Sequence, residues 1–170
     1  MVDRRALLPM LLLPALSLAG CGFQPLYGNR SAGGAAALPE MAQVYIPPIP
    51  DRAGQLLRNE LRDRLTPAGL PDKPRWRLDV SLKETKTDLV ILRDATATFA
   101  KYVGVAQWVL LDLASDAPAA RGQVTRRASY SISSSEFASL QAEEDARRRV
   151  VTEIAEDIRL RLGLYFRRDG

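Results

Sequence analysis

The C-terminal third of the chain carries the pattern that most restricts the fold. Small and apolar residues recur there at helical spacing, at Leu140, Ala146, Val150, Ile154, Ile158, Leu162 and Tyr165. Ser133 and Glu136 have the spacing of a capping box just before this pattern. A helix from Ser135 to Leu164 would be about 45 Å long at about 1.5 Å per residue. Since one stripe of it is apolar, the pattern predicts a long helix that covers a sheet along most of its length.

Three preceding stretches are predicted to be the strands of that sheet. Residues 76–83 alternate between apolar and polar or charged side chains, and residues 124–132 alternate in the same way, so one face of each strand should be buried. The segment 97–113 is apolar at both even and odd positions, and its buried face cannot be assigned from the sequence. Turns are expected at 86–94 and 115–122. Such short connections favour an antiparallel meander.

A short strand and a helix are predicted before the meander. Residues 43–46 are β-prone, and Pro47-Pro48 ends them. Asp51 is the expected N-cap of a helix whose apolar residues recur every four positions from Ala53 to Leu65. The predicted order is therefore β-α-β-β-β-α. The simplest α+β fold with this order is a two-layer sandwich, in which both helices cover one face of a mainly antiparallel four-stranded sheet.

The N-terminus has the layout of an export signal. Arg4 and Arg5 precede an apolar segment of 13 residues, which is too short to cross a membrane as a helix. The segment leads into Leu18-Ala19-Gly20-Cys21, which resembles a bacterial lipobox. At such a site the thiol is diacylated, the preceding residues are removed, and the new amino terminus is acylated. The alternative is a plain signal followed by a chance cysteine, but a free thiol in an exported protein would be open to oxidation.

The expected organisation has three parts. Residues 1–20 are a cleaved signal peptide, residues 21–40 are the lipidated N-terminus with a flexible tether, and residues 41–166 are one α+β domain. Cleavage lowers the formal net charge from +4 to +3, because two arginines and one aspartate are lost. This modest excess is compatible with contact to anionic lipid or to a phosphate-bearing glycolipid, and it does not by itself indicate nucleic acid.

The composition argues against an enzyme. The chain has no histidine, which excludes a Ser-His-Asp triad and histidine metal ligands, and its one thiol is assigned to the lipid anchor. No glycine-rich phosphate loop or metal-type carboxylate spacing is present in the sequence. We expect no catalytic residue, no metal and no cofactor, apart from the covalent diacylglycerol and the N-acyl lipid on Cys21.

Four segments together resemble the lipopolysaccharide-assembly lipoprotein family LptE, in its alphaproteobacterial form. The most specific is the mature start, Cys-Gly-Phe-Gln-Pro-Leu-Tyr-Gly at 21–28. The others are Leu-Arg-Asp-Ala-Thr-Ala at 92–97, Ser-Ser-Glu-Phe-Ala at 134–138 and Asp-Ile-Arg-Leu-Arg-Leu at 157–162.

The resemblance implies a non-enzymatic role. It implies that the protein is a plug within the outer-membrane β-barrel LptD, with one copy of each in the complex. The plug would help the barrel to fold and to deliver lipopolysaccharide to the outer leaflet. Gly22 follows the cysteine in place of the Asp that retains lipoproteins in the inner membrane, so we expect anchoring on the periplasmic side of the outer membrane. The alternative is a free-standing, membrane-tethered periplasmic carrier that binds lipid in an apolar pocket.

Several residues are candidates for contact with lipid or with the partner. The candidates for lipopolysaccharide contact are the basic residues Arg93, Lys101, Arg126 and Arg127. Arginine suits phosphate through its bidentate fork, although solvated surface charges would look the same in a sequence. The candidates for contact with the partner or the membrane interface are Phe23, Pro25, Leu26 and Tyr27.

Two further features are assigned structural roles. Trp76 and Trp108 are expected to pack in the core or against a barrel wall, and not to form a ligand cage. The run Arg147–Arg149 is expected to form a solvated helix face.

Overall fold

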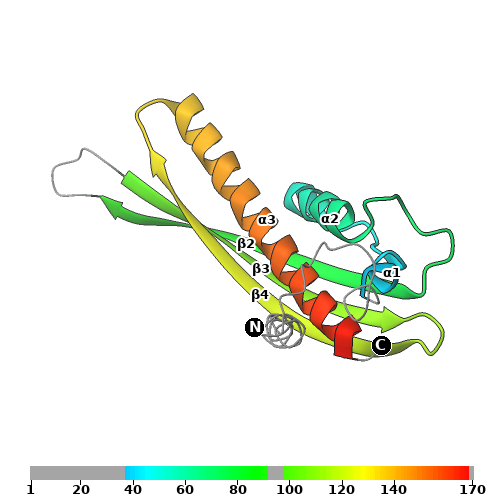
Figure 1. Ribbon diagram of the computed structural model, residues 1–170. Coiled ribbons are helices and arrows are strands. Elements are labelled where there is room, and N and C mark those ends of the chain that lie inside the picture. Colours follow the sequence, from blue (N-terminus) through cyan, green and yellow to red (C-terminus); the bar gives the residue numbers. More distant parts are fainter. Residues whose placement is uncertain (1–36, 92–97, 169–170) are drawn as a thin grey trace, which may run out of the picture.

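The computed structural model describes residues 37–91 and 98–168. The elements are α1 (Ala37–Met41), β1 (Val44–Tyr45), α2 (Asp51–Leu65), β2 (Trp76–Ile91), β3 (Thr98–Asp112), β4 (Ala117–Ile132) and α3 (Glu136–Arg168). The strands form one sheet in the order β1-β2-β3-β4, in which only β1 and β2 run parallel. Figure 1 shows α2 and α3 on the same side of the sheet. The predicted α+β class and the mainly antiparallel four-stranded sheet are confirmed.

The core lies between the sheet and the helices α2 and α3. The buried residues of α3 are Ala146, Val150, Val151, Ile154, Ala155, Ile158, Leu162 and Phe166. The even-numbered residues of β3 from Ala100 to Leu110 are buried beneath the helices, and Tyr102 is among the largest of them. The structure thus assigns the buried face of β3, which the sequence left open.

Gly104 lets α3 approach the middle of β3. A Cβ atom at this position would lie 2.7 Å from Val150 Cγ1 and 3.1 Å from Ile154 Cδ1. We expect Gly104→Val to lower the free energy of unfolding by about 1–3 kcal/mol, because overpacking forces neighbouring side chains off their rotamers. Urea unfolding of the purified mature chain would measure this. The control Ala117→Val enlarges an exposed residue of β4 and should change stability by less than about 0.5 kcal/mol. Equal effects of both substitutions would contradict close packing at Gly104.

Some predicted boundaries are wrong, and the strands are longer than expected. β2 continues to Ile91 through the segment expected to turn at 86–94. β4 begins at Ala117, so that the expected turn at 115–122 is largely strand. Both extended segments pair with β3. The long central strand forms hydrogen bonds with the backbone N–H and C=O groups of its neighbours irrespective of their side chains.

The two long helices begin differently from the expectation. Asp51 is the first residue of α2, with φ of 65°, and Pro50 occupies the N-cap position. At α3 the capping side chain is Ser135, whose Oγ accepts a 3.4 Å hydrogen bond from the Ala138 N–H. Ser133, the expected cap, instead donates from Oγ to the Ser135 carbonyl at 3.1 Å. The helix α1, which begins within the expected tether, was not predicted.

Arg147 is the centre of an ion-pair network between α3 and the sheet. Its guanidinium contacts the carboxylates of Glu84 at 3.3 Å, Glu143 at 3.3 Å and Glu144 at 2.6 Å. Its Nε also donates to the Tyr102 hydroxyl at 3.2 Å, and only 12% of its side chain is exposed. The expectation of a solvated Arg147–Arg149 face is therefore wrong for Arg147, although the next two arginines are exposed.

Both tryptophans are buried in the core, as predicted. Trp76 is 5% exposed and Trp108 is 4% exposed. The ring of Trp76 packs against Tyr165 and Phe166 near the end of α3, with centroid distances of 6.1 and 5.5 Å. Its indole Nε1 donates to Glu40 Oε2 at 2.9 Å, which ties α1 to the start of β2.

Within the described residues, no helix is both long enough and apolar enough to cross a bilayer.

Candidate functional site

The face of the sheet that points away from α2 and α3 is the candidate functional site, and we call it the open face. Within the described residues no helix covers it (Figure 1). The strand register defines its members, because directly paired residues share one face of a sheet. Val103 pairs with Thr85 on β2 and with Arg127 on β4, so the odd-numbered residues of β3 lie on the open face with these partners.

The open face combines an apolar column with basic flanks. Its central strand contributes half-buried aliphatic residues at Val103, Val105, Val109 and Leu111. The basic residues at register positions of this face are Arg77, Lys83, Lys101, Arg121 and Arg127. Asp79 is the acidic residue there, and it accepts a 2.8 Å hydrogen bond from Arg77 Nε. The result is an amphipathic surface with net positive charge, suited to an anionic amphiphile or a polar protein wall.

Two of the four predicted basic candidates meet on this surface. Lys101 pairs with Ser129, and Val103, two residues further along β3, pairs with Arg127. Lys101 and Arg127 are therefore diagonal neighbours on one face, at a typical spacing of about 7–8 Å. One phosphate group can be reached by both side chains.

Arg126 occupies the opposite face of the sheet. It forms an ion pair with Asp157 of α3, approaches Glu153 at 4.0 Å and donates to the Thr125 carbonyl at 3.0 Å. Its charge already serves the packing of α3 on β4, which makes it the weakest of the four candidates for contact with lipid.

The remaining candidates lie outside the described residues. They are Arg93, the lipidation candidate Cys21, and the candidates Phe23, Pro25, Leu26 and Tyr27. Their proposed contacts stay predictions.

A shallow groove at one edge of the open face was not predicted. It has a volume of about 380 Å³ and lies between the segment 47–49 and the strand residues Arg77, Asp79, Gln107 and Val109. In the sequence, the Pro47-Pro48 pair predicts only the end of a strand. These prolines lack N–H groups and therefore cannot extend the ladder of β1 along β2, whose pairing with β1 stops at Arg77. The two prolines directly after this short strand were the sequence signal from which the groove could have been predicted.

The outer edge of β4 is shielded by charged side chains. Arg149 Nη2 donates to the Ser129 carbonyl at 3.4 Å, and Arg126 serves the Thr125 carbonyl in the same way. Charged residues at an edge strand disfavour pairing with another strand. Recognition by this domain is therefore expected on the open face.

No arrangement for metal chemistry was found in the described part of the chain. There, no group of three or more histidine, cysteine, aspartate or glutamate side chains could hold a metal ion.

Similarity to known structures identifies the fold. A putative lipoprotein from Caulobacter crescentus matches with a TM-score of 0.70 and 20% identity, over 80% of this chain and 98% of that one. A minor lipoprotein from Acinetobacter baumannii matches with a TM-score of 0.54 and 14% identity, over 72% and 92%. The rare lipoprotein B from Shewanella oneidensis matches with a TM-score of 0.50 and 12% identity, over 68% and 89%. Among curated protein sequences, none matches significantly.

Similarity at the level of sequence identifies the family. The profile of the family LptE, described as lipopolysaccharide-assembly, matches residues 41–162. This range begins in α1 and ends in the last third of α3, and so it includes every strand of the sheet. The chain therefore belongs to the LptE lipopolysaccharide-assembly family.

Proposed function

We propose that this chain is a lipoprotein of the outer membrane that acts, without catalysis, as the plug and assembly partner of the β-barrel LptD. In this role it is acylated at Cys21, faces the periplasm and supports delivery of lipopolysaccharide to the outer leaflet. The observation that carries the proposal is the open face, which joins an apolar column to five basic residues on a sheet that α2 and α3 cover only from the other side.

The chemistry of the open face fits both ligands of this role. Large outer-membrane barrels have a polar lumen, into which a compact domain with charged surfaces can fit. Lipopolysaccharide carries phosphates and acyl chains, and these match the basic flanks and the half-buried aliphatic residues respectively. Lys101 and Arg127 are the residues that we expect at a phosphate.

The partner is tested by an affinity pull-down from detergent-solubilised outer membrane, with a C-terminal tag on the full chain and mass spectrometry of what is retained. We expect one large barrel protein in near one-to-one amount. Recovery of the lipoprotein alone, folded and in high yield, would contradict the proposal. It would favour the free-standing lipid carrier instead, which should then bind lipid by itself.

The phosphate contact is tested by reversing the two charges together. We expect Lys101→Glu with Arg127→Glu to reduce the lipopolysaccharide retained by the purified complex about tenfold, which corresponds to about 1.4 kcal/mol. The control reverses Arg148 and Arg149, which are exposed on α3, and should leave retention unchanged. Equal retention by both double variants would contradict contact at the open face while leaving the partnership with the barrel intact.

A further inference from the structure

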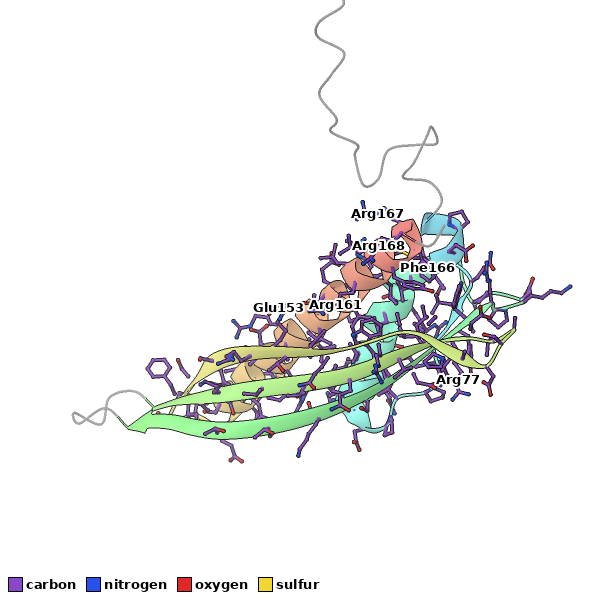
Figure 2. The ribbon with its side chains drawn as sticks, turned by 90° about the horizontal axis from the view of Figure 1, so that it is seen from below. Arg77, Glu153, Arg161, Phe166, Arg167 and Arg168 are labelled. Carbon is purple, nitrogen blue, oxygen red and sulfur yellow. The ribbon has the colours of Figure 1, made fainter. Side chains whose placement is uncertain are left out.

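The last three turns of α3 present a second exposed surface, which we call the terminal face. It consists of Leu160, Arg161, Leu164, Arg167 and Arg168. At about 100° per residue these five positions fall within an arc of about 120°. The two leucines are 46% and 53% exposed, whereas Leu162 and Phe166 of the same turns are buried in the core. Figure 2 labels the three arginines along the C-terminal part of α3.

The terminal face is basic. Arg161 pairs with Asp157, one turn earlier, and Arg167 Nε donates to the Gly163 carbonyl at 3.3 Å. Within the described residues, neither Arg167 nor Arg168 forms an ion pair. Two exposed leucines flanked by arginines give the pattern of a helix that lies at a membrane surface, with apolar groups entering the headgroup region and guanidinium groups at the phosphates.

The chain enters the fold beside this face. The helix α1 packs there, since a Cβ on Gly163 would lie 2.9 Å from Met41 Cε (Figure 1). Cys21 precedes Ala37 by 16 residues, which span at most about 55 Å. An acyl chain on Cys21 therefore keeps the membrane surface within reach of the terminal face.

We propose that the terminal face binds the anionic phospholipid surface of the membrane in which Cys21 is anchored. The proposal rests on the proposed function, because it requires an acylated Cys21. It adds to that function a second membrane contact, which would orient the sheet relative to the bilayer. A second copy of the chain is a poor occupant. A stable interface buries about 800 Å² and about 20–30 residues on each partner, whereas the terminal face consists of five residues. The arginines of two such faces would also repel each other.

Labelled cysteines in the acylated mature chain test this contact. Once Cys21 is acylated, Leu164→Cys supplies the one reactive thiol for an environment-sensitive fluorophore. Leu140→Cys is the matched control, because it is a leucine of the same helix, 54% exposed, at the opposite end. Both proteins are reconstituted into two kinds of vesicle. The anionic vesicles contain phosphatidylethanolamine and phosphatidylglycerol, and in the neutral vesicles phosphatidylcholine replaces the phosphatidylglycerol.

We expect the probe at 164 to be blue-shifted, and to be quenched by nitroxide lipid roughly threefold more than the probe at 140, in the anionic vesicles only. Arg167→Glu with Arg168→Glu should abolish the difference. Equal quenching at both positions in vesicle-bound protein would overturn this inference and leave the lipid anchor standing. Failure of the chain to float with the vesicles would overturn the anchor and the inference together. In detergent without anionic lipid, a blue shift that grows with protein concentration would assign the terminal face to contact with a second copy. That result would also overturn the inference.

Discussion

Replacing Trp76 by alanine is expected to lower the free energy of unfolding by about 3–5 kcal/mol. The substitution removes a buried ring that packs on Tyr165 and Phe166, and it also removes the indole N–H that holds Glu40. Both losses loosen the end of the domain where α1 meets α3. Urea unfolding of the mature chain, followed by far-ultraviolet circular dichroism, measures the change without depending on the lost fluorophore.

Two further variants separate the causes. Trp76→Phe keeps an aromatic ring but loses the donor to Glu40, and it should cost about 1–2 kcal/mol. Phe137→Ala removes an aromatic ring that is 72% exposed at the opposite end of α3, and it should cost less than about 0.5 kcal/mol. If Trp76→Ala proved no more destabilising than Phe137→Ala, the aromatic cluster would not hold this end together.

The sequence predicted the layers of this fold because its periodic patterns are long. The apolar stripe from Leu140 to Tyr165 could only be a buried helix, and the alternation at 76–82 could only be a strand with one buried face. The predicted strand boundaries are wrong where the side chains show no regular alternation of apolar and polar residues. Residues 83–88 of β2 are polar on both faces, and β4 begins with Ala-Pro-Ala-Ala. In both places pairing with β3 sets the structure, and pairing between distant segments is not visible in local sequence.

The candidate site was predicted only in part, because it too depends on pairing between distant segments. The sequence predicts Lys101 and Arg127 as exposed basic residues, but their position on one face depends on the register of β3 with β4. The parity of that register also separates Arg127 from Arg126, which are adjacent in sequence and lie on opposite faces. The apolar odd positions of β3 were the signal of the open face, but they could not be distinguished from a strand covered on both sides.

A run of three arginines predicts a solvated helix face, and this prediction is wrong for Arg147. Three acidic side chains from two elements approach Arg147, and Tyr102 lies under its guanidinium with 5.5 Å between the guanidinium carbon and the ring centroid. Glu143 and Glu144 are its neighbours on α3, so they could be predicted from i,i+4 and i,i+3 spacing. Glu84 and Tyr102 come from β2 and β3, and they reach Arg147 only because α3 packs on the sheet.

Replacing Arg147 by methionine is therefore expected to lower the free energy of unfolding by about 2–3 kcal/mol at neutral pH. The substitution leaves Glu84, Glu143 and Glu144 close together without their shared cation, and it removes a donor from the Tyr102 hydroxyl. The matched control is Arg149→Met, two residues further along α3. It breaks an exposed pair with Asp145 and an exposed hydrogen bond to the Ser129 carbonyl, and it should cost less than about 0.5 kcal/mol. Urea unfolding of the mature chain measures both. Similar losses in the two variants would contradict a central role for Arg147.

The pH dependence of this difference tests its electrostatic origin. The hydrogen bond from Arg147 lowers the pKa of Glu144 below its ordinary value. A carboxyl with a lowered pKa in the folded state adds stability above its unfolded pKa of about 4.3, and that stability is lost as the pH falls through the folded value. The gap between wild type and Arg147→Met should therefore be full above about pH 5 and should narrow as the pH falls below 4. A gap that stayed constant over this range would mean that Arg147 stabilises the fold through packing of its side chain and not through its charge.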